Sequence, residues 1–259
     1  MSFYDASVED TINRIKYIET NVVNLMDDEV VLYFQPKISS NDDSVYGYEA
    51  LMRWNSPVIG WVSPPEIIHA VDNLGLMEVL DKKIIIKAFK AISENARIQN
   101  KSISINISPT SINSSSIVDI IDNSAKKYGI DLNYIDIEIT EDSLLDDYGN
   151  TLSNIDALRK KGLSISLDDF GKGYSSLSYL SSFNIDYLKI DKLFIDKLGT
   201  HRGDGMVESI IKMAHINDIK VVAEGVEDKQ QAMILKSMNC DLFQGYYFGK
   251  PTCITNLRN

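Results

Sequence analysis

The sequence of 259 residues predicts an α/β fold, a barrel of eight strands built from repeated strand–helix units. The first observation is a series of eight strand-like segments, of which the last six alternate with helical segments. The second is that acidic or amide side chains close most of these segments, at the ends where such barrels carry their chemistry. The third is that no glycine-rich dinucleotide fingerprint follows the first strand, which disfavours a doubly wound sheet.

The first part of the chain predicts a helix followed by a hairpin. Apolar residues recur at helical spacing over residues 7–26, which indicates an amphipathic helix. We expect it to pack on the domain, with a dimer contact or the stub of a coupling helix as the alternative. We expect residues 1–27 to form this lead-in segment and residues 28–259 to form the barrel domain. Residues 29–38 and 45–52 are strand-like, and their link is too short for a parallel crossover. One of these two strands must therefore run against the others.

A capping box marks the next helix. Ser63 is a candidate cap, prolines fill the first turn, and Glu66 stands three residues after the cap. A helix is expected from this point to about residue 73. Gly75 interrupts the pattern, and a second helix is expected over residues 77–97.

From residue 102 onward, strand-like and helical segments alternate. The strand-like segments are residues 102–107, 134–140, 164–168, 186–190, 219–224 and 240–244. The helical segments between them are residues 114–128, 151–161, 175–182, 204–217 and 229–238. In the segment 134–140 the isoleucines share one face, and Asp136, Glu138 and Thr140 share the other.

Composition excludes several classes of function. The net charge of −11, from 26 basic and 37 acidic residues, argues against DNA, RNA or an anionic membrane surface as partner. No apolar stretch is long enough for a membrane segment and no signal peptide is recognisable, so a cytoplasmic location is expected. Cys240 and Cys253 fit reduced thiols. His69, His201 and His215 are scattered, so zinc is disfavoured and any metal would be held by oxygen.

Polar residues close or interrupt the predicted strands. They are Glu49, Asn106, Glu138, Asp168, Asp169, Lys189, Asp191, Glu224 and Gln244. Carboxylates that meet in one cleft need cations, and oxygen ligands suit Mg²⁺ or Mn²⁺. A shared aspartate suits two ions about 3.5–4 Å apart, the arrangement that hydrolyses phosphoesters. Lys189 and Arg53 could then hold a phosphate oxygen, and a lysine could also hold the attacking water.

Two neighbouring aspartates form the centre of this pattern. Adjacent residues of a regular strand point to opposite faces, so Asp168 and Asp169 can share a site only where the backbone turns. The two glycines that follow are suited to this turn. We interpret residues 170–176 as a mobile lid or interface loop, with an ordinary turn as the alternative. The loop is not a Walker A motif, because Ser166 stands where that motif needs glycine.

From about residue 32 to residue 251, the chain resembles the EAL-domain cyclic-di-GMP phosphodiesterases. The motifs that carry the resemblance are Glu49-Ala50-Leu51 followed by Arg53, Asn106-Ile107-Ser108-Pro109, Glu138-Ile139-Thr140-Glu141, Asp168-Asp169-Phe170-Gly171, Gly173-Tyr174-Ser175-Ser176-Leu177, Lys189-Ile190-Asp191, Glu224-Gly225-Val226-Glu227 and Gln244-Gly245-Tyr246. The resemblance implies a TIM-like (β/α)8 barrel with an antiparallel first strand. It also implies hydrolysis of cyclic-di-GMP to linear pGpG in bacterial signalling, and a homodimer.

The resemblance implies a role for each matched residue. Metal ligands would be Glu49, Asn106, Glu138, Asp168 and Asp169 of a two-ion magnesium or manganese site, with Glu224 nearby. Lys189 would hold or deprotonate the water, Gln244 would position it, and Glu141 would anchor the loop at 168–177. Gln35, Arg53 and Asp191 would contact the nucleotide or support the metal ligands.

Three departures from the family pattern leave these ligands intact. Lys172 replaces a usual threonine, Lys37 stands where an apolar residue is common, and Asp72 replaces a usual glutamate. Two alternatives to a cyclic-di-GMP phosphodiesterase stay open. One is a receptor or protein-interaction module that binds the nucleotide without turnover. The other is a barrel phosphodiesterase with a different cyclic dinucleotide as substrate.

Overall fold

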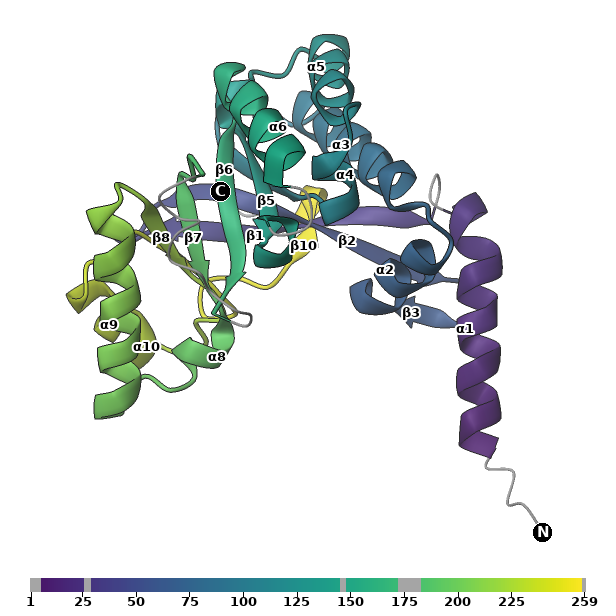
Figure 1. The fold of residues 1–259 in the computed structure, drawn as a ribbon. Helices are drawn as coiled ribbons and strands as arrows, with labels where there is room; N and C mark the ends of the chain where they lie inside the picture. Colours follow the sequence, from purple (N-terminus) through teal and green to yellow (C-terminus); the bar gives the residue numbers. More distant parts are fainter. Residues whose placement is uncertain (1–5, 26–28, 145–147, 172–182, 258–259) are drawn as a thin grey trace.

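The computed structural model describes residues 6–25, 29–144, 148–171 and 183–257. Among these residues, eight strands close into a barrel in the order β1-β2-β4-β5-β6-β7-β8-β9 (Figure 1). β1 (Val30–Ser39) is antiparallel to both of its barrel neighbours, β2 (Val45–Ser56) and β9 (Leu242–Gln244). The other neighbouring pairs in the barrel are parallel. The predicted TIM-like barrel with an antiparallel first strand is therefore confirmed.

The central strands are short and buried. They are β4 (Ser102–Asn106), β5 (Ile135–Thr140), β6 (Ser164–Phe170), β7 (Tyr187–Ile190) and β8 (Lys220–Ala223). Two further strands extend the sheet outside the barrel. β3 (Gly60–Val62) pairs with β2, and β10 (Thr252–Cys253) pairs with β1.

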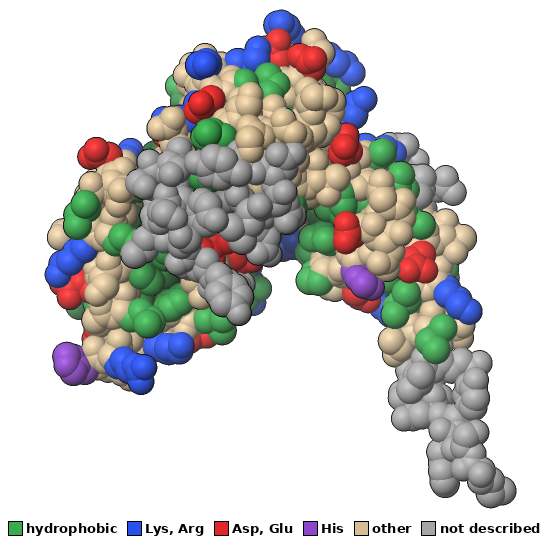
Figure 2. All heavy atoms as spheres, in the orientation of Figure 1, with side chains coloured by type: hydrophobic (Ala, Val, Ile, Leu, Met, Phe, Trp, Pro, Cys, Tyr) green, Lys and Arg blue, Asp and Glu red, His purple; other side chains and the backbone are tan. Residues whose placement is uncertain are grey.

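Helices surround the barrel, and their apolar sides form the core with the outward faces of the strands (Figure 1). They are α1 (Ala6–Leu25), α2 (Pro64–Asn73), α3 (Met77–Ser93), α4 (Pro109–Asn113), α5 (Ile117–Tyr128), α6 (Tyr148–Lys160), α8 (Lys192–Ile195), α9 (His201–Ile216) and α10 (Lys229–Ser237). Short 3-10 turns lie at Leu132–Tyr134, Glu141–Leu144 and Ile254–Asn256. None of the described helices is long and apolar enough to span a bilayer. Figure 2 shows acidic and basic side chains interspersed over one face of the molecule.

α1 extends away from the barrel and is attached beside α2 (Figure 1). Ile18 and Val22 are buried in the core. Arg14 forms an ion pair of 2.7 Å with Glu66 of α2, and it donates to the carbonyl oxygens of Ile59 and Trp61 at 3.0 and 2.7 Å. Glu66 also accepts from the main chain and hydroxyl of Ser63, the predicted capping box. The helix is therefore tied to the turn that joins β2 and β3.

Several boundaries differ from the sequence prediction. β2 continues four residues beyond residue 52, and β3, α4 and α8 were not predicted. α3 ends at Ser93 and not at residue 97, because Asn95 Oδ1 accepts the N–H of Arg97 at 3.0 Å in a turn that competes with the helix. Ser108 caps α4, and its hydroxyl accepts the N–H of Ser111. The helix predicted at 175–182 lies outside the described residues.

Candidate active site

Four carboxylates surround one buried lysine at the mouth of the barrel. Lys189 on β7 is 1% exposed, and its Nζ lies 2.7 Å from Glu138 Oε2 and 2.8 Å from Glu224 Oε1. The same ammonium lies 3.1 Å from Asp168 Oδ2 and 3.8 Å from Glu49 Oε1. These side chains come from β2, β5, β6, β7 and the segment after β8. The closed sheet thus brings together residues that are far apart in the sequence.

Two amides hold Glu49 in place. Gln244 Nε2 donates to Glu49 Oε2 at 2.6 Å, and Asn106 Nδ2 donates to Glu49 Oε1 at 2.8 Å. Gln244 also donates to Gln35 Oε1 at 3.2 Å, and Gln35 donates to the carbonyl of Gly249 at 3.1 Å. Glu49 and Gln35 are direct partners in the β1–β2 ladder, so the reversed strand places Gln35 at the same mouth.

Burial and charge shift the pKa values within this cluster. Burial would lower the pKa of Lys189, but the neighbouring carboxylates, Glu138 foremost, raise it well above the ordinary value. Burial would raise the pKa of Glu49, but Lys189 and two amide hydrogen bonds lower it to about 2. Burial raises the pKa of Glu224 to about 7, and burial with the charge of Glu49 raises that of Glu138. The cluster therefore holds more acid groups than one ammonium can balance.

The backbone turns at Asp169 itself. Its φ is +57°, in the left-handed region, and the β6–β7 register is irregular between Leu167 and Phe170. The Asp169 N–H donates to Asp168 Oδ1 at 2.7 Å. The turn expected from the glycines therefore begins two residues before Gly171, inside the pair of aspartates. This bulge is the break in alternation that the sequence required for both carboxylates to serve one site.

Glu141, which follows β5, contacts the end of this bulge. Its Oε2 accepts the N–H of Gly171 in a long hydrogen bond of 3.4 Å. Most of the loop that Glu141 was expected to anchor, including Lys172 and the motif at 173–177, lies outside the described residues. The role of that loop as a lid or an interface stays a prediction.

Two predicted site residues make other contacts. Asp191 caps α8 by accepting the N–H of Leu193 at 2.8 Å. The Arg53 guanidinium donates to the carbonyl of Met52 at 2.7 Å and lies 6.0 Å from the centroid of the Tyr33 ring. Arg53 thus lies beside the carboxylate cluster, on the wall of an adjoining pocket.

Two hollows meet at Glu49. The first, of about 370 Å³, exposes the site side chains Gln35, Glu49, Asp168, Glu224 and Gln244. The second, of about 400 Å³, is mainly apolar and is lined by residues of β2, α2, α3, the end of β4 and the segment after it, including Arg53 and Asn106. The carboxylate-lined hollow suits a cation, and the apolar hollow suits an apolar or aromatic group.

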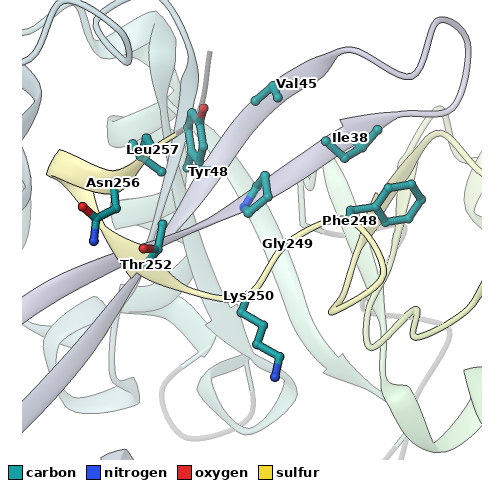
Figure 3. Close-up of a pocket in the computed structure, with 10 residues that line it drawn as sticks. Ile38, Val45, Tyr48, Phe248, Gly249, Lys250, Thr252, Asn256 and Leu257 are labelled. Atoms are coloured by element: carbon teal, nitrogen blue, oxygen red, sulfur yellow. The ribbon is translucent and has the colours of Figure 1, made fainter.

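A larger hollow of about 520 Å³ lies on the outer wall of the barrel (Figure 3). Its lining comes from β1, β2 and the C-terminal segment, and includes Tyr48, Phe248 and Lys250. None of its lining residues is a carboxylate, whereas the smaller polar hollow contains four. We therefore place the candidate chemistry at the mouth of the barrel.

The oxygen atoms of the site are suited to a divalent cation. Two buried oxygens among the described side chains, Glu138 Oε1 and Gln244 Oε1, have no hydrogen-bond partner, although buried polar atoms are normally paired. Carboxylate and amide oxygens are the ligands that Mg²⁺ and Mn²⁺ prefer. In the described part of the chain, no three acidic, histidine or cysteine side chains are already grouped to hold a metal ion. The Lys189 ammonium takes the central position between the carboxylates.

The sequence pattern did not identify the residues beneath this cluster. Asp136 accepts hydrogen bonds from Ser166 at 2.7 and 2.8 Å, and Lys37 lies 3.4 Å from Asp136 Oδ2. A signal for Asp136 was present, because the alternation of β5 puts it on the same face as Glu138. Lys37 differed from the family pattern, but its partners come from strands that only the closed barrel brings near.

Comparison with known proteins gives a consistent result. The family model described as "EAL domain" matches residues 21–251. The biofilm architecture maintenance protein MbaA of Vibrio cholerae is 32% identical over 99% of this chain and 33% of its own length. The cyclic di-GMP phosphodiesterase NbdA of Pseudomonas aeruginosa is 34% identical over 88% of this chain and 29% of its own. The chain thus spans about a third of the length of these relatives.

Solved structures are similar over nearly the whole chain. The EAL enzyme Bd1971, with cAMP and cyclic-di-GMP bound, is 32% identical with a TM-score of 0.86, over 95% of this chain and 68% of that one. The PaMucR phosphodiesterase in complex with c-di-GMP is 27% identical with a TM-score of 0.83, over 92% of this chain and 97% of that one.

Proposed function

The chain belongs to the EAL domain family, and from this premise we propose that it hydrolyses one phosphodiester bond of cyclic-di-GMP to give linear pGpG. The observation that carries the proposal is the convergence of Glu49, Glu138, Asp168 and Glu224 on Lys189 at the barrel mouth. Relatives named as a cyclic di-GMP phosphodiesterase and as a c-di-GMP complex support the choice of substrate.

We propose that the reaction needs Mg²⁺ or Mn²⁺. The residues that would hold the ions are Glu49, Asn106, Glu138, Asp168 and Asp169, with Glu224 beside them. When bound, the ions would stabilise the charge of the phosphoryl oxygens and favour a hydroxide nucleophile. They would also neutralise the acid groups that Lys189 balances only in part.

The remaining residues would orient the reactants. With the carboxylates engaged by cations, the Lys189 ammonium would be free to donate to the attacking water or to a phosphoryl oxygen. Gln244 would position both Glu49 and that water. Its Nε2 donates to Glu49, and its Oε1, which has no hydrogen-bond partner among the described residues, would accept from the water. Attack forms a new P–O bond, breaks one P–O3′ bond, and passes the water proton to the leaving alkoxide. Arg53 would meet the nucleotide in the adjoining apolar hollow.

The catalytic unit would be residues 28–259, with residues 1–27 as the lead-in segment. The family resemblance also favours a homodimer, and sedimentation of the purified chain would measure its assembly. The expected contact region includes residues outside the described part of the chain.

The test is turnover of cyclic-di-GMP with MgCl₂ or MnCl₂, compared between the wild type, Glu49→Ala and Glu208→Ala. Glu208 is an exposed carboxylate on α9, paired only with Lys212 one turn away among the contacts described. We expect Glu49→Ala to lose at least about 100-fold in rate, and the control to keep full rate. Equal rates for all three proteins would contradict the proposal. Tight binding without product would indicate a receptor, and faster cleavage of cyclic-di-AMP would indicate a different substrate.

A further inference from the structure

A second polar cluster lies one step deeper in the barrel than the carboxylates around Lys189. It consists of Lys37 on β1, Ser104 on β4, Asp136 on β5 and Ser166 on β6, and we call it the inner polar layer. All four residues are buried, Lys37 at 2% and Asp136 at 1% exposure. The hydroxyls of Ser104 and Ser166 both donate to the Asp136 carboxylate. These donors satisfy the buried oxygens of the Asp136 carboxylate.

Lys37 is the cation of this layer. Its ammonium donates to Ser104 Oγ, lies 3.4 Å from Asp136 Oδ2 and lies 3.8 Å from Glu138 Oε1. That last oxygen has no hydrogen-bond partner among the described residues, while the other oxygen of Glu138 accepts from Lys189 at 2.7 Å. Glu138 therefore lies between two ammonium groups, one at the mouth and one in the inner polar layer.

We propose that Lys37 is a positioning residue whose ammonium is shared between Asp136 and Glu138, and that this sharing sets how strongly Glu138 binds a divalent cation. A shift of under about 1 Å would bring the ammonium within hydrogen-bond distance of Glu138 Oε1. The inference rests on the proposed metal-dependent function and adds to it a residue outside the inferred ligand set.

The proposal predicts that removing the charge of Asp136 weakens binding of the divalent cation and that removing the charge of Lys37 strengthens it. Without the Asp136 charge, Glu138 becomes the nearest acidic partner of Lys37, and a metal ion must compete with that ammonium. Without Lys37, Glu138 loses a nearby cation that repels the metal ion. Removing both charges leaves the net charge of the layer unchanged. A purely structural role gives a different pattern, because loss of packing weakens binding in both single variants.

The test measures Mn²⁺ binding to the full chain after EDTA treatment, without substrate and at one fixed pH. The electron paramagnetic resonance signal of free Mn²⁺ reports the bound fraction during titration with MnCl₂. The variants are Lys37→Met, Asp136→Asn and the double variant, with Lys126→Met on the surface of α5 as control. We expect about tenfold tighter binding for Lys37→Met, about tenfold weaker binding for Asp136→Asn, and a return to within about twofold in the double variant.

Each result decides the question. If Mn²⁺ affinity changes in the same direction in both single variants, or in neither, the proposed role of Lys37 is overturned and the proposed metal-dependent function is unaffected. A wild-type chain that binds no Mn²⁺ overturns this role and the metal-dependent function together. Circular dichroism confirms that each variant is folded. If Asp136→Asn does not fold, Ser104→Ala replaces it, because it removes the hydroxyl anchor of Lys37 and leaves both charges in place. The proposal then requires weaker Mn²⁺ binding for Ser104→Ala, and unchanged binding overturns it.

Discussion

Replacement of Lys189 by methionine is expected to destabilise the metal-free protein strongly. The substitution keeps the length of the side chain but leaves four carboxylates, all within 3.8 Å of the lost ammonium, without their central cation. Breaking a buried charge pair by removing one partner costs about 3–5 kcal/mol. For a chain of this size, about 2–4 °C in melting temperature corresponds to each kcal/mol. The expected loss is therefore roughly 6–20 °C.

Calorimetry in EDTA and in excess MnCl₂ measures this loss. Because a divalent cation can replace the missing positive charge, Mn²⁺ should raise the melting temperature of Lys189→Met more than that of the wild type. Lys126→Met is the matched control, since its ammonium is paired with Asp122 but its side chain is 73% exposed. An exposed pair contributes about 0–1 kcal/mol, so the control should melt within about 4 °C of the wild type. If Lys189→Met in EDTA has the same melting temperature as this control, the central role of the ammonium is refuted.

Three further predictions concern Glu224, the two cysteines and Arg14. Burial raises the pKa of Glu224 to about 7, so between pH 4.5 and 7 the folded state keeps a proton that the unfolded chain releases. Urea unfolding in EDTA should show stability falling by about 3 kcal/mol as pH rises through this window, and Glu224→Gln should flatten the fall. Iodoacetamide at pH 8 should modify Cys253 and spare Cys240. Burial raises the pKa of the Cys240 thiol to about 12, whereas the Thr255 hydroxyl lowers the pKa of the Cys253 thiol. Mass spectrometry of the labelled native protein measures this difference, and equal labelling of the two cysteines would contradict it. Arg14→Ala should lower stability by about 1–2 kcal/mol and speed hydrogen exchange in α1, and unchanged exchange there would show that the arginine does not hold the helix.

The barrel could be predicted from the sequence because its strands have a regular pattern. Each parallel strand is a short apolar run closed by a polar residue, and this pattern depends only on burial and strand geometry. The short link between residues 38 and 45 required one of the first two strands to run against the others, and the family resemblance identified it as the first. The additional strand β3 and the short helices α4 and α8 were missed, since segments of three to five residues have no measurable periodicity.

The candidate site was predicted in part. The strand-end pattern placed Glu49, Glu138 and Asp168 at one mouth, because parallel strands share their carboxyl ends. It gave no indication that Lys189 lies between the carboxylates, since contacts across a barrel depend on how the strands close. Arg53 and Asp191 were selected by motif. In the structure Arg53 lies beside the cluster and donates to the carbonyl of Met52, and Asp191 caps α8.

The bulge at Asp169 required the structure. A left-handed backbone at an aspartate is uncommon, and a sequence with glycines two and four residues later directs attention to the glycines. The inner polar layer was missed for a related reason. Lys37, Ser104 and Asp136 lie on three strands, and each looks unremarkable in its own segment.

The direction of β1 determines where the polypeptide enters the barrel. In a barrel whose strands all run the same way, the chain arrives at the face opposite the chemistry. Here Val30, at the start of β1, pairs with Trp54 near the end of β2, so the chain arrives at the rim that carries Glu49. α1 is fastened to that rim through Arg14 and the β2–β3 turn. Because α1 packs on α2, and Pro64 and Ile68 of α2 line the apolar hollow, a pull on this helix would act first on the wall of that hollow.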